Sequence, residues 1–387
     1  EEENKEKKKN IKKEKKNTTK QQIKTIITSN KNKFNHAINQ KEHSLFWKEI
    51  GGHITPSSCV AFSPKNNLIA STSQDGMIRG LPLSEVGVAS AHDIYTNVGG
   101  LSTALAFTQN GRRIVVAING TLKFYSFIIS DSERKFEFVK KLETGFKFIS
   151  SIQLLDVEQW MVIVISGRDE FDEPCVRAFD RNGTRIANFV QIKRKGRVDK
   201  NRIPLPKKAL TAASPDDRFI VIYGVGEAEG VKDGDVGIFE IVRDKATGHA
   251  TGLSLSFAFA GHTSDVVACG WNSNGKKFIT CCEDGSWRLW DATIQYYEHD
   301  KPRLYSDPQS LPNGVIPSHV AIMKGDIVVF AAGRDLIYCT SGSGEVISHI
   351  QDATVTPIIS TAMSVNGQYF ATVVENVKRI AIFTSPS

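Results

Sequence analysis

A short unit that recurs five times is the feature of this sequence that most limits its fold. The unit contains a strand, a turn of the type Ser-Pro-Asp or Asn-Gly, a second strand, a tight turn with Asp or Gly, and a further strand. Its first turn lies within residues 61–70, 106–115, 213–220, 271–279 and 363–371. Because one such unit cannot bury its apolar face alone, the recurrence predicts a repeat architecture with stacked neighbouring units.

The composition of the repeats is typical of an all-β fold. From residue 44 onward, short β-branched and aromatic runs alternate with Gly, Asn and Asp, and no long amphipathic helix is present. The chain has 387 residues, of which 40% are hydrophobic, so it can bury a sizeable core. Its densest apolar run, at residues 160–165, is far shorter than the roughly 18 residues that would span a bilayer.

The clearest copy of the unit carries a recognisable motif. Gly-His at 261–262 opens it, Asp-Gly at 284–285 makes its second turn, and Trp-Asp at 290–291 closes it. This order resembles the Gly-His…Trp-Asp pattern of WD40 repeats. In that family a His, a strand hydroxyl, an Asp and a Trp form a hydrogen-bonded structural cluster. The resemblance assigns those places to His262, Thr280, Asp284 and Trp290.

Spacing predicts seven such units, or blades, which is typical of the family. The motif has decayed elsewhere: Gly52-His53 and Asp75-Gly76 remain in one unit, but Gly80 stands where we expect Trp. Two further blades fit by spacing near residues 148–192 and 318–350. Because the chain ends on a strand near Phe383, we expect residues 45–48 to supply the outer strand of the last blade and close the ring. Residues 44–387 are therefore predicted to form a seven-bladed WD40 β-propeller.

Positive charge is concentrated before the repeats. Residues 1–50 contain 14 Lys and 7 Glu, which leaves 35 basic and 35 acidic residues in the remainder. Residues 1–43, here called the basic arm, have few large apolar side chains, so burial cannot offset the entropy of ordering them. We expect a disordered or extended arm.

A second cluster of cations, here called the basic loop, lies within residues 193–208. Cations that neutralise phosphates bind RNA or anionic lipid in a salt-dependent, sequence-independent way, although a charge run is also a common solvated tail that binds nothing. The arm lacks interleaved aromatic residues, so base-specific readout is not expected. The candidate contacts are Lys7, Lys8, Lys9, Lys12, Lys13, Lys15, Lys16, Lys193, Arg194, Lys195, Arg197, Lys200, Arg202, Lys207 and Lys208.

Two other groups of residues each have a functional and a structural interpretation. Trp287, Tyr296 and Tyr297 are candidates for protein docking, with packing between blades as the alternative. The acidic residues Asp169, Glu170 and Asp172 are explained by a solvated loop better than by a metal site.

No catalytic or cofactor-binding set is expected. The glycine-rich residues 223–230 follow a strand, but another strand rather than a helix comes next, which argues against a dinucleotide loop. The six cysteines lack metal-ligand spacing and are expected to be reduced. We predict no cofactor, no metal, no small-molecule substrate and no enzymatic activity.

A closer resemblance rests on residues 257–262, 284–291 and 296–304, and on the ending at 366–386. These segments are similar to the transducin beta-like protein 2 family. The resemblance implies a propeller on the cytosolic face of the endoplasmic-reticulum membrane, a hydrophobic N-terminal anchor, links to stress signalling and translation, and no known catalysis. Because numbering begins at Glu1 rather than Met, we expect such an anchor in a preceding segment. A cytoplasmic location is the alternative.

These observations favour a non-enzymatic scaffold. It would dock protein partners through the blades, and RNA or the ribosome through the basic arm and basic loop. The alternative is a membrane-tethered exchange factor or cargo adaptor of the secretory pathway. Fold-level likeness alone does not decide between them, because propellers support many functions.

Overall fold

The computed structural model describes most of the chain that follows the basic arm. The described residues are 45–65, 67–85, 94–129, 134–157, 160–190, 209–224, 235–293 and 303–385. The candidate contacts of the basic arm and basic loop lie outside them, as do Tyr296 and Tyr297. Within the described part of the chain, no helix is long and apolar enough to cross a membrane.

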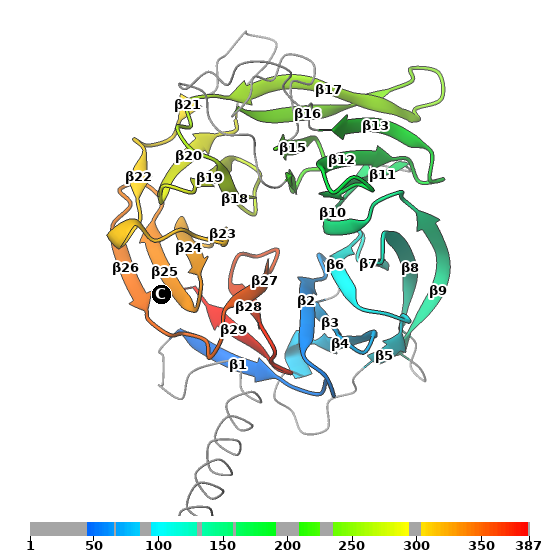
Figure 1. Cartoon of the computed structure of the whole chain (residues 1–387), viewed down its shortest axis with the longest axis horizontal. Helices are drawn as coiled ribbons and strands as arrows, with labels where there is room; N and C mark the ends of the chain where they lie inside the picture. The colour runs from blue at the N-terminus through cyan, green and yellow to red at the C-terminus, as the bar shows by residue number, and fades with distance from the viewer. Residues whose placement is uncertain are drawn as a thin grey trace, which may run out of the picture.

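Seven antiparallel sheets form a ring around a central channel, as Figure 1 shows. This confirms the prediction of an all-β, seven-bladed propeller. Blades 1 to 4 comprise β2 (Ser57–Phe62), β3 (Leu68–Ser73), β4 (Met77–Pro82) and β5 (Ile94–Asn97); β6 (Ser102–Phe107), β7 (Arg113–Ile118), β8 (Thr121–Ile129) and β9 (Arg134–Glu143); β10 (Phe148–Val157), β11 (Trp160–Arg168), β12 (Pro174–Phe179) and β13 (Arg185–Val190); and β14 (Leu210–Ala213), β15 (Phe219–Tyr223), β16 (Val236–Arg243) and β17 (Ala250–Phe259).

The remaining three blades follow the same order from the channel outward. They comprise β18 (Val266–Trp271), β19 (Lys277–Cys282), β20 (Ser286–Asp291), β21 (Arg303–Leu304) and β22 (Gln309–Ser310); β23 (His319–Met323), β24 (Ile327–Ala332), β25 (Asp335–Thr340) and β26 (Val346–Ile350); and β27 (Ile358–Met363), β28 (Tyr369–Val374), β29 (Ile380–Thr384) and β1 (Phe46–Ile50). Two short 3-10 helices, η1 (Leu83–Glu85) and η3 (Pro312–Gly314), lie between strands.

The first strand of the domain closes the ring. β1 pairs with β29, and the two strands lie side by side in Figure 1. The Thr384 amide donates a 2.8 Å hydrogen bond to the Leu45 carbonyl, and the Phe46 and Phe383 rings pack edge to face at 6.0 Å. Ring closure by the segment around residues 45–48 is thereby confirmed. The third strand of the last blade, β29, has a hydrogen-bonded neighbour on each side, so its edge is not left open.

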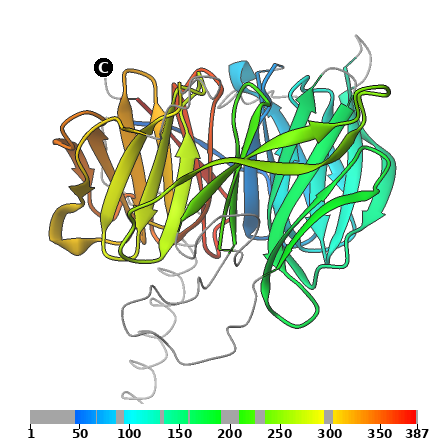
Figure 2. The same ribbon diagram turned by 90° about the horizontal axis from the view of Figure 1, so that it is seen from above.

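The two faces of the ring are defined by its connections, and Figure 2 shows the ring from the side. We call upper the face that carries the connections between blades and the second turn within each blade, although this face points to the bottom of Figure 2. The lower face carries the first and third turns. Each blade therefore places the first residues of its innermost strand at the upper face.

The recurring first turn is held by its own side chains. The residue that opens it accepts a hydrogen bond from the backbone amide five residues later. The residue two positions after the opening one accepts another amide, for example Asp216 from Arg218. The opening residues are Thr108, Ser214, Asn272 and Ser364. Short side chains that accept backbone hydrogen bonds explain why Ser, Thr, Asn and Asp recur there.

The core lies between blades rather than inside any one of them. Each sheet buries side chains on both faces against its two neighbours, so each apolar cluster contains residues from adjacent blades. One cluster joins blades 4 and 5 and includes Phe259, Phe278 and Trp290, with the Phe259 and Trp290 rings stacked at 4.5 Å. This packing fixes the blades and hence the positions of their connecting loops.

Candidate docking face

Several large apolar side chains are exposed on the upper face. In the described residues, six of them lie there: three in connections between blades, Phe171 in a second turn, and two at the first or second residue of an innermost strand. They are Ile54, Leu101, Phe148, Phe171, Ile316 and Ile359. The turns of the lower face contain Val365. The remaining ones, except Val242 on the third strand β16, lie on or beside outer strands, where Tyr95, Leu304, Val346 and Ile347 occupy the ends nearest the lower face. Exposed apolar side chains in loops that a rigid scaffold positions are candidates for contacts with a partner protein.

The upper face surrounds the entrance to a central cavity of about 510 Å³. Hydroxyl groups line much of it, including Ser58, Thr103, Ser150 and Thr211. Among the lining residues in the described chain, none is Asp, Glu, Lys or Arg. A cavity with this lining has no general acid or base of the usual kinds apart from His319.

Two of the buried cysteines are poor nucleophiles. Burial raises the pKa of the cavity-lining Cys59 thiol to about 11, and the same cause raises the pKa of Cys175 to about 11. Both thiols are therefore protonated at neutral pH, which suppresses their nucleophilicity. The described ranges also contain no group of three or more His, Cys, Asp or Glu side chains arranged to hold a metal ion.

Three of the four residues assigned to the structural cluster of blade 5 bond directly. Thr280 Oγ1 accepts a 2.9 Å hydrogen bond from Trp290 Nε1 and lies 3.0 Å from His262 Nε2. Asp284 instead accepts the Ser286 amide at 2.8 Å and lies 3.3 Å from the Thr263 hydroxyl. The assignment of Asp284 as a hydrogen-bonded member of the cluster is therefore corrected: it stabilises its own turn and joins that turn to the preceding connection through Thr263.

The contacts of His262 determine where its proton lies. Arg288 Nη1 is 3.0 Å from His262 Nδ1, and a guanidinium can only donate. Nδ1 is therefore the acceptor, also for the Cys282 thiol at 2.9 Å, and Nε2–H donates to Thr280. Burial and then Arg288 lower the pKa of His262 to about 4, so the imidazole is neutral at pH 7. His262 thus has a structural role.

The third strands of the blades show why the Trp motif has decayed without loss of the fold. Leu81 pairs with Ile69 as Trp290 pairs with Phe278, so Leu81 takes the Trp position of blade 1, and its assignment to Gly80 was wrong by one residue. Every other blade also buries a residue there. These residues are Tyr125, Phe179, Phe239, Cys339 and Phe383. Different apolar side chains fill the same space between blades.

A second recurring feature, a cation on the third strand of several blades, was not recognised in the sequence. Two residues before the Trp position, blades 1, 2, 3 and 5 carry a cation that reaches the connection from the preceding blade. Lys123 donates to the Val98 carbonyl at 2.6 Å, and Arg177 donates to the Thr144 carbonyl at 2.9 Å. The equivalent Arg288 bonds His262. These cations hold the loops that carry the upper face, and an alignment of the blades with one another would have revealed them.

Arg79 is the member of this set in blade 1. Its guanidinium lies over the Tyr95 ring at 5.7 Å and against Gly52, where an added Cβ would lie 2.1 Å from Arg79 Nη1. Gly52 has a φ of 112°, which an L side chain rarely adopts. The sequence Gly-His at 52–53 therefore leaves room for Arg79, while His53 Nε2 lies 2.8 Å from Ser71 Oγ.

For Trp287 the docking hypothesis is wrong and the alternative of packing between blades is confirmed, and the solvated position expected for Asp169 is also wrong. Trp287 is 1% exposed and packs against Phe330 of blade 6, with ring centroids 5.5 Å apart, so it cannot dock a partner. Side chains alternate along β20, and both faces of a blade are covered, so Trp287 and Trp290 pack against opposite neighbours. Asp169 is 5% exposed rather than solvated, because its carboxylate accepts backbone amides within its turn.

Comparisons with known proteins agree with this architecture. A family model, WD domain, G-beta repeat, matches residues 46–79 and 253–291. The chain is 21% identical over 345 residues to transducin beta-like protein 2 of Mus musculus, and 19% identical over 346 residues to that of Homo sapiens. Each alignment covers 87% of this chain and 72% of the relative. The resemblance indicated by the sequence motifs is confirmed.

A solved structure supports the fold. The crystal structure of the Cps50 (Swd1) β-propeller domain of Myceliophteria thermophila superposes with a TM-score of 0.59. The superposition covers 88% of this chain and 99% of that one, at 15% sequence identity. At this level of identity the likeness concerns the fold alone.

Proposed function

We propose that this WD40-repeat propeller, which is similar over most of its length to transducin beta-like protein 2, is a non-enzymatic scaffold that docks partner proteins on its upper face. One observation carries the proposal: the described connections and turns of that face present four large exposed apolar side chains, Ile54, Leu101, Phe171 and Ile316, whereas the described turns of the opposite face present one, Val365. A partner that covers exposed apolar groups removes their surface from water, and this burial favours binding.

Two of the loops that present these side chains are held in place before a partner arrives. Lys123 donates to Val98 in the connection that contains Leu101, and Arg177 donates to Thr144 in the connection that precedes Phe148. A loop that is ordered in the free protein loses less conformational entropy on binding. The upper face is therefore suited to recognition by a largely preformed surface.

A pair of substitutions tests the docking face. Ile54→Glu combined with Ile316→Glu places two charges on the upper face, and Val365→Glu places one on the lower face. Proteins that co-purify with the full chain from cells should fall at least tenfold for the double variant and stay within twofold for Val365→Glu. Equal losses for the two variants, with both folded, would refute the assignment of the upper face.

We further propose a place on the cytosolic face of the endoplasmic-reticulum membrane, with links to translation and stress signalling. This proposal is supported by the resemblance to transducin beta-like protein 2 and by the charge of the basic arm and basic loop. In it, the cations of these two segments contact RNA or the ribosome. Such contacts depend on phosphate neutralisation, so they weaken steeply as salt rises.

The electrostatic part has its own test. RNA bound to the full chain is compared with RNA bound to a variant in which Lys7, Lys8, Lys9, Lys12, Lys13, Lys15 and Lys16 are replaced by Gln. Affinity for a single-stranded RNA should fall with the substitutions, and the slope of log affinity against log salt should become shallower. Unchanged affinity and an unchanged slope would remove the basic arm from the proposal.

A further inference from the structure

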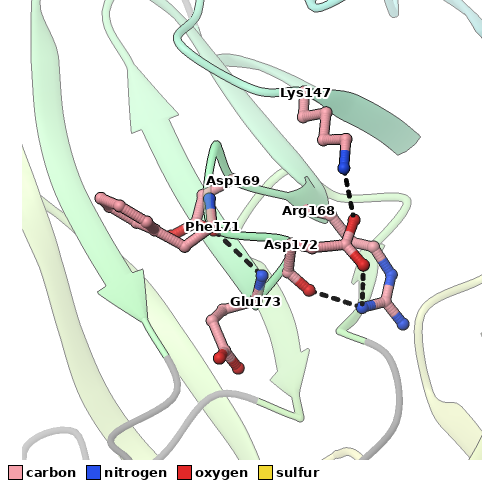
Figure 3. Close-up of polar contacts among 6 residues, drawn as sticks. All are labelled: Lys147, Arg168, Asp169, Phe171, Asp172 and Glu173. Carbon is pink, nitrogen blue, oxygen red and sulfur yellow. Dashed lines mark hydrogen bonds and ion pairs between the residues drawn. The ribbon is translucent and has the colours of Figure 1, made fainter.

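Among the described residues, Phe171 is the most exposed aromatic side chain on the upper face. It lies in the second turn of blade 3, between β11 and β12, and is 76% exposed. In Figure 3 its ring points away from Lys147 and Arg168, which lie on the other side of the turn. Burying a Phe side chain stabilises a protein by roughly 1.5–3 kcal/mol relative to leaving it in water. Because Phe171 does not contribute this free energy to the fold, its outward position points to a role in binding.

The turn around Phe171 is braced by a buried carboxylate. Asp169 Oδ1 accepts the backbone amides of Phe171 and Glu173, each at 3.0 Å, and one of these bonds is drawn in Figure 3. The Asp169 amide donates to the Glu173 carbonyl at 3.0 Å, and the Asp172 amide donates to the Asp169 carbonyl at 3.1 Å. Asp172 adopts a φ of 65°, in the left-handed region that Asp tolerates better than most residues.

Two cations secure the far side of the same turn. Arg168 Nη1 donates to the Asp172 carbonyl oxygen at 2.6 Å, and Lys147 Nζ lies 3.3 Å from Asp172 Oδ1. The ion pairs are exposed, and exposed pairs contribute little to stability. The hydrogen bonds accepted by the buried Asp169 are therefore the main interactions that stabilise the turn. They form within this chain, so the conformation of the turn does not depend on a partner.

The surroundings of Phe171 are acidic. Asp169, Glu170, Asp172 and Glu173 provide four carboxylates in a turn of five residues. Asp169 is occupied by backbone amides, and Lys147 and Arg168 lie against Asp172. Glu170 is exposed directly beside Phe171 in the sequence. A partner that covers Phe171 meets this carboxylate at the edge of the contact.

We infer that Phe171 is an anchor that inserts into an apolar pocket of a folded partner protein, and that Lys or Arg side chains line the rim of that pocket. This inference rests on the proposed docking function of the upper face. A rigid aromatic anchor loses little conformational entropy on binding, and such residues dominate the energy of many protein interfaces. Lys or Arg at the rim would complement the acidic turn.

The first experiment replaces Phe171 with the photoreactive analogue p-benzoyl-phenylalanine in the full chain in cells. Val365, Ile54 and Ile316 are replaced in parallel chains. Position 171 should form an adduct with one dominant protein, and the cross-linked segment of that protein should combine apolar residues with nearby Lys or Arg. Position 365 should not form this adduct.

The other outcomes separate the anchor from the wider proposal. Adducts at 54 or 316 without one at 171 would overturn the anchor and leave the docking face intact. An adduct at 365 that equals those on the upper face would overturn both. An adduct to residues 193–208 of this chain, or to RNA, would overturn the anchor, because the occupant would then be another segment or another class of molecule.

The second experiment measures affinity for the cross-linked partner after purification. Phe171→Ala should raise the Kd about 30-fold or more, as expected for a buried aromatic anchor, and Phe171→Leu, which keeps a large apolar side chain, should raise it clearly less. Asp169→Asn keeps the Phe171 ring but weakens the hydrogen bonds that the residue at 169 accepts from the turn, and it should raise the Kd several-fold. Val365→Ala is the matched control, and an effect of Phe171→Ala below twofold would refute the anchor.

Discussion

The connections between blades on the upper face and the first turns on the lower face are held in different ways. A lower turn is held by its own residues: Ser214 Oγ accepts the amide of Phe219, five residues later. An upper connection is held from a distance: Arg177, on a third strand, donates to the carbonyl of Thr144, 33 residues earlier. A loop held from outside is free to present side chains of its own, and the described loops of this face present more exposed large apolar residues than the lower turns do.

This difference separates two requirements that a repeat sequence has to satisfy. The lower turns need particular small polar side chains, so their sequences resemble one another. The upper connections need a partner elsewhere in the blade, so their own sequences can diverge toward a binding surface. The predictions below test whether the two faces differ in this way.

The largest expected effect is on stability at acid pH and concerns the upper connection that contains His262. Its folded-state pKa of about 4 lies below the value near 6.5 expected in the unfolded chain. The unfolded state therefore binds more protons, so stability is fully present above about pH 6.5 and is lost as pH falls toward 4. The contribution is on the order of 3 kcal/mol.

The measurement compares the wild type with His262→Gln, whose side chain does not titrate. The difference between their free energies of unfolding, from urea titrations, should shrink by roughly 3 kcal/mol between pH 7 and pH 4. Taking the difference cancels the titration of groups common to both proteins. A difference that is independent of pH would contradict a buried neutral His262.

A smaller effect is expected from glycines on the two faces. Gly52→Ala and Gly275→Ala both force a methyl group onto a backbone with positive φ, which costs about 1 kcal/mol. At Gly52 the methyl group also collides with Arg79, whereas at Gly275 the nearest atom, Pro215 Cδ, is 3.6 Å away. Gly52→Ala should therefore cost about 2 kcal/mol or more, measured by denaturant unfolding, and equal costs would mean that Arg79 moves freely.

The smallest effect is expected from cations on the two faces. Arg177→Met removes the hydrogen bond to Thr144 and the contact with the Phe146 ring, so local opening of residues 144–147 should become easier by about 1 kcal/mol. Arg218→Met is the lower-face control, because Arg218 lies over the Phe219 ring beside a turn that Ser214 already holds. Amide hydrogen exchange of residues 144–147 and 214–218 measures both, and equal acceleration would remove the distinction between the faces.

The sequence predicted those features that recur at a fixed spacing. The seven blades, closure of the ring near Phe46 and the His262–Thr280–Trp290 contacts all follow from repetition and alternation along strands. Contacts between residues of neighbouring blades were harder to predict from the sequence. Leu81 was overlooked at the Trp position because a Leu is an ordinary strand residue, and only its pairing with Ile69 reveals its place.

The site was predicted less well than the fold for a physical reason. Whether an aromatic side chain is buried depends on the neighbouring blade, which the local pattern does not specify. Trp287 was therefore assigned to a docking patch although blade 6 covers it, and Phe171 was not singled out although it is exposed. The buried role of Asp169 was hidden in the same way, since an acidic turn normally indicates solvent.

Hydrogen exchange of the propeller alone and in complex with a partner that co-purifies from cells tests the docking face most directly. Binding should slow exchange in the upper connections at residues 51–56, 98–101, 144–147 and 311–318 and in the turn at 169–173. Exchange in the lower turns at 214–218, 272–276 and 364–368 should stay unchanged. Protection confined to the lower turns, with the upper connections unaffected, would contradict the assignment of the upper face as the docking surface.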